Sequence, residues 1–287
     1  LSRRQRQMCI RDSMYTEYQP SHLLVPYIDS YWEFKGNPDY GMRIHILPDG
    51  CTDFIFTLGE VANAVEEGSL IMQPYRSYFV GPMTKYSELV TYTESIHMFG
   101  VRFLPCGLSC FTNLPLHEFV NSRVSTNEMK AVFDDTFIEK LGEQKHVTDR
   151  IRVVEEYLLA YLARHYQPAD SHVAMAVNMI NHSKGKRSVR SLMDDVCLCQ
   201  RHFERKFKHY TGFTPKEYSR IVKFKNAVEL LRTTTSANLL TTAVDAGYYD
   251  LAHFSKEIKS MSGNTPASFL SLTVPEETTL TYIEPQR

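Results

Sequence analysis

The sequence predicts an α+β fold, in which an N-terminal antiparallel β-barrel or sandwich with helices precedes an all-α domain of two helix-turn-helix units. Strand-like runs broken by turn residues fill the first part, and a repeat at an offset of 51 residues occupies the last part. Residues 184–270 hold 15 Lys and Arg against 8 Asp and Glu, a charge of +7, whereas residues 14–183 hold 12 against 21, a charge of −9. A basic segment joined to an acidic one favours a polyanionic partner for the basic segment.

The domain boundaries follow from these shifts in pattern. Residues 1–13 look like a non-native leader, because four arginines precede Met14, a suitable initiator, and a basic arm that touches DNA is the alternative. The remaining segments are a β-rich sensor or dimerisation domain (14–166), a DNA-binding domain (171–272) with units at 188–218 and 239–269, and a tail (273–287).

The N-terminal part reads as several short strands. The turn signature Pro48-Asp49-Gly50 separates the first two strand-like runs, and Gly81-Pro82 marks a turn between two later runs. Regularly spaced short strands of this kind favour an antiparallel barrel or sandwich. The expected strands are Arg43–Leu47, Thr52–Leu58, Leu70–Val80, Glu88–Thr93 and Ile96–Leu104.

An amphipathic helix is expected over Val147–His165. Its apolar residues Ile151, Val154, Leu158 and Leu162 recur at helical spacing and are flanked by charged residues. The apolar stripe could pack on the barrel or pair with its twin in a dimer, and the pattern leaves both open.

The repeat is the most specific feature of the chain. At the fixed offset, Phe203 matches Phe254, Gly212 matches Gly263, and Thr214-Pro215 matches Thr265-Pro266. Further matched pairs are Phe207 with Ile258, Tyr218 with Phe269, His202 with His253, and Lys208 with Lys259. Agreement of so many special residue types at one offset predicts two copies of one supersecondary unit.

Each copy reads as a short helix, a tight turn and a second helix. The first helices are expected over Ser188–Asp195 and Leu239–Ala246, and Gly247 suits the positive φ at a helix C-terminus. The second helices begin near Cys199, a poor N-cap, and near Asp250, a good one. Thr214 and Glu217 form a capping box for a long helix over Lys216–Arg232, which would join the units as a rigid spacer.

These residues are similar to a known family. The run FERKFK before GFTPKEY, and the run GYYDLAHFSK before GNTP, resemble the two units of AraC/XylS-family transcription regulators. The resemblance covers the C-terminal domain. The N-terminal motifs YWEF, LPDGCTDFIF, VGPMT and GVRF look like a sensor-type domain found in one branch of that family. The resemblance implies sequence-specific binding of double-stranded promoter DNA in the cytoplasm, and no enzymatic activity.

The predicted DNA contacts lie on the second helix of each unit. With Phe203 and Phe207 facing the core, Arg201, Arg205 and Lys208 project outward, and a recognition helix places such residues in the major groove. Arg201 and Arg205 could each bind guanine O6 and N7, whereas Lys206 and Lys208 suit phosphates. The resemblance adds Glu204. The full predicted set is Gln200, Arg201, His202, Glu204, Arg205, Lys208, Leu251, Ala252, Ser255 and Lys256.

An effector pocket is expected in the β-rich domain. An aromatic cluster around Trp32 and the polar residues Arg43, His45, Asp53 and Arg102 could line it. A structural ion pair between Arg43 and Asp53 across a hairpin is the alternative interpretation.

A barrel enzyme or metal-binding protein with an appended helical domain is the alternative function, and an effector-independent architectural DNA binder is a third. A cupin-like metal barrel needs a His-x-His pair, and the isolated His45, His97 and His117 do not supply one. We expect no metal, no cofactor and reduced cysteines, namely Cys9, Cys51, Cys106, Cys110, Cys197 and Cys199. We expect a small-molecule effector, a homodimer and contact with RNA polymerase as further partners, and no membrane.

Overall fold

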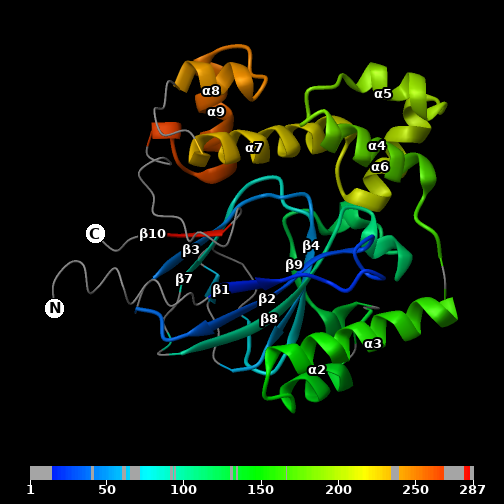
Figure 1. Ribbon diagram of the computed structural model, residues 1–287, viewed down its shortest axis with the longest axis vertical. Helices are drawn as coiled ribbons and strands as arrows, with labels where there is room; N and C mark the ends of the chain where they lie inside the picture. Colours follow the sequence, from blue (N-terminus) through cyan, green and yellow to red (C-terminus); the bar gives the residue numbers. More distant parts are fainter. Residues whose placement is uncertain are drawn as a thin grey trace.

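A computed structural model describes most of the chain (Figure 1). The leader expected at 1–13 lies outside the described residues, as does most of the tail expected at 273–287. The described residues are 15–39, 42–59, 63–64, 72–90, 93, 95–129, 132–133, 135–165, 167–233, 239–267 and 281–284.

The N-terminal domain contains two antiparallel sheets, as the sequence predicts. The larger sheet has six strands in the order β1-β2-β8-β4-β6-β9. The smaller has four, in the order β10-β3-β7-β5. The strands are β1 (Tyr15–Tyr18), β2 (Ile28–Gly36), β3 (Arg43–Ile46), β4 (Thr52–Thr57), β5 (Asn63–Ala64), β6 (Ser77–Val80), β7 (Ser87–Val90), β8 (Ile96–Phe103), β9 (Arg123–Ser125) and β10 (Thr281–Glu284).

Strands β3 and β4 are both formed where the sequence predicts them, but they do not form a hairpin. Strand β3 pairs with β7 and β10 in the smaller sheet, whereas β4 pairs with β6 and β8 in the larger. The turn between them carries the chain from one sheet to the other. Gly50 adopts φ 86° there, and the Asp49 carboxylate accepts a hydrogen bond from the Cys51 amide at 2.8 Å.

The expected strand at 70–80 is shorter than predicted. Among its described residues only Ser77–Val80 are extended, because the chain turns at Tyr75, which has a positive φ of 57°. The Thr57 hydroxyl holds this turn by donating to the carbonyl oxygens of Gln73 and Arg76 at 2.7 and 2.9 Å.

Side-chain alternation gives the larger sheet two buried faces. Along β4, Phe54 and Phe56 point to one face and Ile55 points to the other. The first face packs against α2 (Asp135–Gly142) and α3 (Val147–His165), which cover the sheet in Figure 1. The second face packs against the smaller sheet through residues such as Leu89 of β7. Helix α3 has the predicted bounds and buries its apolar stripe on the sheet.

The C-terminal domain is all-helical. Three short 3-10 helices, η1 (Gly107–Cys110), η2 (Leu116–Phe119) and η3 (Thr126–Glu128), precede it in the chain. Its helices are α4 (Ser171–His182), α5 (Val189–Val196), α6 (Gln200–Thr211), α7 (Pro215–Thr233), α8 (Leu239–Asp245) and α9 (Leu251–Ser262). The two predicted units correspond to α5–α6 and α8–α9. The helix expected after Thr265-Pro266 lies mostly outside the described residues, and α4 was not predicted.

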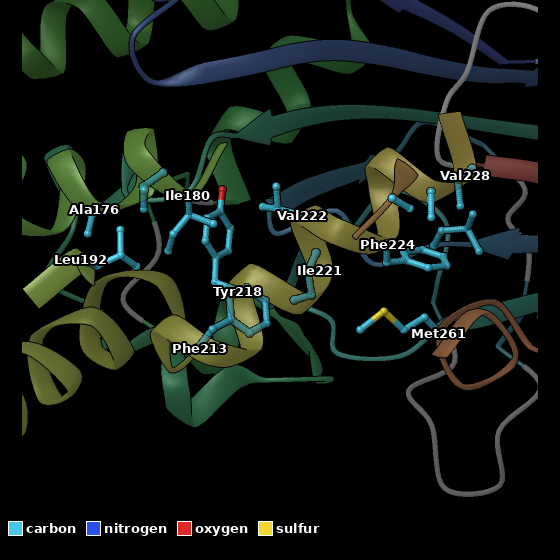
Figure 2. Close-up of a cluster of buried hydrophobic side chains, with 14 of the residues drawn as sticks. Ala176, Ile180, Leu192, Phe213, Tyr218, Ile221, Val222, Phe224, Val228 and Met261 are labelled. Atoms are coloured by element: carbon cyan, nitrogen blue, oxygen red, sulfur yellow. The ribbon is translucent and has the colours of Figure 1, made fainter. Parts of the chain in front are cut away.

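Helix α7 joins the two units, as the sequence predicts. Thr214 and Glu217 form its capping box: the Glu217 carboxylate accepts from the Thr214 amide at 2.7 Å, and the Thr214 hydroxyl accepts from the Glu217 amide at 3.1 Å. Its side chains form a continuous core with both units, part of which Figure 2 shows. Tyr218, at the centre, donates a hydrogen bond to Asn181 of α4 at 3.0 Å. Arg220 of α7 binds Glu257 of α9 with nitrogen–oxygen distances of 3.0–3.1 Å.

Candidate nucleic-acid interface and effector cavity

Helix α6 presents one polar face outside the fold. Phe203 and Phe207 are fully buried, as predicted from their spacing. Gln200, Arg201, Arg205 and Lys208 are exposed, and His202 and Glu204 are half-buried. Gln200 donates a hydrogen bond to Glu204 at 2.9 Å, so these two side chains form a polar pair one helical turn apart.

The exposed arginines of α6 are not engaged elsewhere. Arg201, Arg205 and Lys208 make no ion pair with any described residue. Lys206 differs, because its ammonium binds the Asp170 carboxylate at 2.6 Å and ties α6 to the residue that caps α4. This ion pair competes with the phosphate contact that the sequence predicts for Lys206.

Helix α9 exposes a more apolar face. Leu251, Ala252 and Lys256 are exposed and Ser255 is half-buried, whereas Phe254 and Ile258 are fully buried. The Asp250 carboxylate caps the helix by accepting from the His253 amide at 2.7 Å. All ten residues predicted to contact DNA thus lie on α6 or α9, and none of them is buried.

Tyr249 is an interface candidate that the sequence analysis missed. It lies in the turn immediately before α9 and is 91% exposed. Leu240 and Val244, on α8, are also more than half exposed. Large exposed apolar side chains often mark binding surfaces. Its place in the sequence could have identified Tyr249, because it lies in the short turn between Gly247, which ends one helix, and Asp250, which caps the next.

The C-terminal ends of α6 and α9 rest on one loop of the N-terminal domain. A Cβ atom on Gly212, which ends α6, would lie 2.5 Å from Cγ of Pro82, and one on Gly263, which ends α9, would lie 2.7 Å from Cζ of Tyr86. Both glycines have positive φ angles, 84° and 78°. Residues 81–86, which we call the bridging loop, thus contact equivalent positions of both units, and the N-terminal ends of α6 and α9 point away from it.

A cavity lies between the two sheets of the N-terminal domain. It is small, about 50 Å³, and open in part to solvent. Most of its wall is apolar, and polar groups come from Asp53, Arg102 and Arg123. The apolar and aromatic lining residues are Tyr15, Trp32, Phe34, Ile44, Ile46, Ile55, Val80, Met83, Leu89 and Met98.

Three of the five residues predicted for an effector pocket line this cavity, namely Trp32, Asp53 and Arg102. Arg43 does not, because its side chain is 53% exposed and binds Glu88 at 2.6 Å. His45 is buried beside Glu88 and stacks on Tyr86 with a centroid distance of 5.7 Å. The alternative ion pair between Arg43 and Asp53 is not formed, because β3 and β4 belong to different sheets.

Arg102 is the centre of a buried ion cluster at the cavity wall. Its guanidinium contacts carboxylate oxygens of Glu17 at 3.2 Å, Asp53 at 3.3 Å and Asp49 at 3.5 Å. Burial, opposed by Arg102 and reinforced by the neighbouring Asp49 carboxylate, raises the pKa of Asp53 to about 6. The Trp32 indole donates a hydrogen bond to Asp53 at 2.7 Å.

The position of Trp32 depends on a glycine in the adjacent strand. Gly100 of β8 lies opposite Trp32 of β2, and a Cβ atom on Gly100 would lie 1.9 Å from Cε2 of the indole ring. The indole therefore lies flat over the glycine, and only a residue without a side chain fits beneath it.

The described residues contain no group of three His, Cys, Asp or Glu side chains suited to hold a metal ion. None of the helices in the described part of the chain combines the length and apolar character that crossing a bilayer requires.

Two segments of the chain match models of known protein families. Residues 16–125 match the model of a domain of unknown function, DUF6597, and residues 192–271 match the model of a helix-turn-helix domain. No curated protein sequence matches the chain.

The chain is also similar to solved structures. ToxT from Vibrio cholerae aligns with a TM-score of 0.50 and 9% identity, over 85% of this chain and 98% of that one. ToxT with a bound unsaturated fatty acid gives 0.48 and 11%, over 85% and 96% of the two chains. The C-terminal domain of AraT, a response regulator from Geobacillus stearothermophilus, gives 0.34 and 20%, over 38% and 92%. The first of these shows that the two-domain fold is shared. Residues 192–271 are thus a helix-turn-helix domain of the AraC type, and the chain that carries it is a DNA-binding transcription regulator.

Proposed function

We propose that the chain binds promoter DNA through α6 and α9 and that a small molecule in the N-terminal cavity controls this binding. The observation that carries the proposal is the matched placement of the two helices. Each has its C-terminal glycine on the bridging loop and its N-terminal half exposed. Helices presented in this way could enter successive major grooves on one face of the DNA, about 34 Å apart.

In this proposal the two units make different contributions. Arg201 and Arg205 of α6 would bind guanine edges, and Lys208 would bind a phosphate. Around α9, Tyr249, Leu251 and Ala252 would instead contact thymine methyl groups or sugars, and Lys256 would bind a phosphate. The first unit would therefore supply most of the sequence discrimination, and the second would add affinity and register.

The lining of the cavity favours a small, mostly apolar effector with one polar end. Because the cavity is only about 50 Å³, the lining side chains must move to admit such an effector. The apolar walls favour such a molecule through burial, and Asp53 and Arg123 are polar groups to which its end could bind. We infer the chemical class from these lining residues alone.

The bridging loop offers a route from the cavity to the DNA-binding helices. Val80 and Met83 line the cavity, whereas Pro82 and Tyr86, in the same stretch of chain, contact the ends of α6 and α9. An effector that displaces Met83 would shift the loop and change the relative placement of the two units. Such an effector regulates only if it has different affinities for the DNA-competent and DNA-incompetent arrangements.

Trp32 provides a direct probe of effector binding, because it is the single tryptophan of the chain and lines the cavity. We expect a true effector to change the fluorescence of Trp32 saturably and to raise the melting temperature. Gly100→Ala should abolish both responses, because the added methyl group must displace the indole. Gly142→Ala is the matched control, since the added methyl group would meet no atom within 4 Å beyond its chain neighbours and the nearby backbone of its own helix. If an effector alters DNA affinity but leaves Trp32 fluorescence unchanged, it binds outside this cavity.

Selection of bound sequences from random duplex DNA tests the proposed function itself. We expect an enriched site with two conserved patches one helical turn apart, and an affinity that falls steeply with salt concentration as phosphate contacts require. Failure to enrich any sequence would remove the basis of the proposal.

We also propose that the protein acts in the cytoplasm, without enzymatic activity, and that it forms a homodimer and contacts RNA polymerase. The cytoplasmic location and the lack of enzymatic activity follow from its role at promoter DNA. The homodimer and the contact with RNA polymerase are expectations drawn from the family resemblance. Sedimentation of the full chain with and without effector tests the dimer.

A further inference from the structure

The turn of the first helix-turn-helix unit exposes two cysteines. Cys197 and Cys199 are both exposed, whereas the other cysteines in the described part of the chain, Cys51, Cys106 and Cys110, are all buried. Cysteine is among the residue types most often buried. Two exposed thiols separated by one residue therefore need a reason beyond packing.

Neither thiol suits the backbone position that it occupies. Cys197 ends α5 in the left-handed conformation with φ 54°, where a side chain is strained, and the second unit has Gly247 with φ 87° at its corresponding turn. Cys199 is the N-cap of α6 but makes no side-chain capping hydrogen bond, whereas Asp250 caps α9. The second unit thus has a glycine at its left-handed position, one residue earlier in the repeat than Cys197, and a carboxylate at its N-cap, whereas the first unit has a thiol at each.

The pair also lies beside the predicted DNA contacts. Cys199 directly precedes Gln200 and Arg201, the first two residues of α6. The position of Arg201 relative to a base edge therefore depends on the conformation of this turn.

We propose that Cys197 and Cys199 form a peroxide-sensitive thiol pair that lowers DNA affinity when it is oxidised to a disulfide. The inference rests on the proposed DNA-binding function, which it extends with a regulatory modification. In the first step one cysteine loses its proton to solvent, its thiolate attacks the peroxide, and the O–O bond breaks. A sulfenic acid and a hydroxide ion form, and the hydroxide takes up a proton from solvent to become water. In the second step the other thiol displaces the hydroxyl group as water and the S–S bond forms, so two thiols are oxidised and one peroxide is reduced.

The spacing permits this bond within one chain. Two residue steps span at most about 7 Å between Cα atoms, and disulfides join Cα atoms about 4.4–6.8 Å apart. Closing so small a ring restricts the φ and ψ angles of Leu198 and of both cysteines. The extended conformation of Cys199 at the start of α6 would change, and the first turn of the helix would move with it.

Full-length protein, reduced or treated with hydrogen peroxide, is titrated against a selected DNA duplex by fluorescence anisotropy. We expect oxidation to weaken binding on the order of tenfold, the effect of misplacing one bidentate base contact, and dithiothreitol to restore it. The control is the double variant Cys197→Gly and Cys199→Asp, which places the second unit's residues in the first unit. It should bind DNA equally well before and after peroxide treatment.

Mass spectrometry detects the disulfide independently of DNA binding. Trypsin releases Ser191–Arg201, a peptide that contains both of these cysteines and no other, and the disulfide makes it lighter by two hydrogen atoms. Oxidation of Met193 in the same peptide is distinguishable because it adds an oxygen atom.

If peroxide oxidises Met193 but leaves both thiols of the peptide free, the inference is overturned. A disulfide that forms but leaves DNA affinity unchanged also overturns it. A disulfide between two chains, seen as a dimer on a non-reducing gel, would also contradict it. If the reduced protein binds no DNA at all, the proposed function fails instead, and the regulatory inference falls with it.

Discussion

Replacing Arg205 with alanine should relax the base preference at one position of the DNA site. A bidentate contact between arginine and guanine contributes about 1–3 kcal/mol of discrimination against the wrong base. Arg205 is exposed on α6 and forms no ion pair with any described residue, so its guanidinium is free to make such a contact. The variant should bind the selected site more weakly but lose little affinity for duplexes already altered at the contacted base pair.

Lys256→Ala on α9 is the matched comparison. Lys256 occupies in α9 the position that Arg205 occupies in α6, and it is also exposed. A lysine ammonium lacks the bidentate fork of a guanidinium, so it suits a phosphate better than a base edge. This variant should weaken binding to all sequences alike and reduce the slope of the salt dependence by about one contact. Binding to a panel of single-base variants of the selected site measures both effects. Equal loss of discrimination in the two variants would contradict the division between the units.

Replacing Arg102 with methionine should destabilise the N-terminal domain more than any other single change considered in this protein. The substitution leaves the carboxylates of Glu17, Asp49 and Asp53 near the cavity without their shared counter-ion. Removing one partner of a buried ion pair destabilises proteins by about 3–5 kcal/mol. Urea denaturation of the full chain, monitored by Trp32 fluorescence, measures this loss.

The loss should depend on pH in a defined direction. The pKa of Asp53 is raised to about 6, so its carboxyl group holds a proton more readily in the folded than in the unfolded protein. Arg102 lowers this pKa, so in the variant the pKa of Asp53 lies further above 6. Protonation removes one of the unpaired charges, and the loss of stability relative to the wild type should therefore grow as the pH rises above about 6. Arg43→Met is the control. It also removes an arginine bound to a carboxylate, but Arg43 is half exposed, and exposed pairs contribute about 1 kcal/mol or less. Equal destabilisation by both variants would show that the buried cluster has no special role.

The DNA-binding domain could be predicted from the sequence because its determinants are local and duplicated. The periodicity of Phe203 and Phe207 orients α6, and capping residues such as Thr214 and Asp250 define the helix boundaries. The repeat then supports each assignment a second time. Helix α4 was missed, although Asp170 caps it by accepting from the amides of His172 and Val173.

The effector cavity could be predicted only in part, because it is assembled from distant strands. Trp32, Asp53 and Arg102 were identified. Arg123 reaches the wall through the pairing of β9 with β6, and Met83 through the bridging loop, and local patterns encode neither. The expected ion pair between Arg43 and Asp53 across a hairpin is not formed for a related reason. Adjacency in sequence suggested that β3 and β4 pair, whereas the turn at Gly50 sends them into separate sheets.

The central claim is that α6 and α9 occupy two successive major grooves of one DNA site. Ethylation interference on a selected duplex tests it, because ethylated phosphates block the backbone contacts of both helices whatever the base sequence. We expect two groups of interfering phosphates on one face, with centres about 10 base pairs apart. Lys256→Ala should weaken interference in one group only. A single group, or two groups on opposite faces of the duplex, would contradict the account.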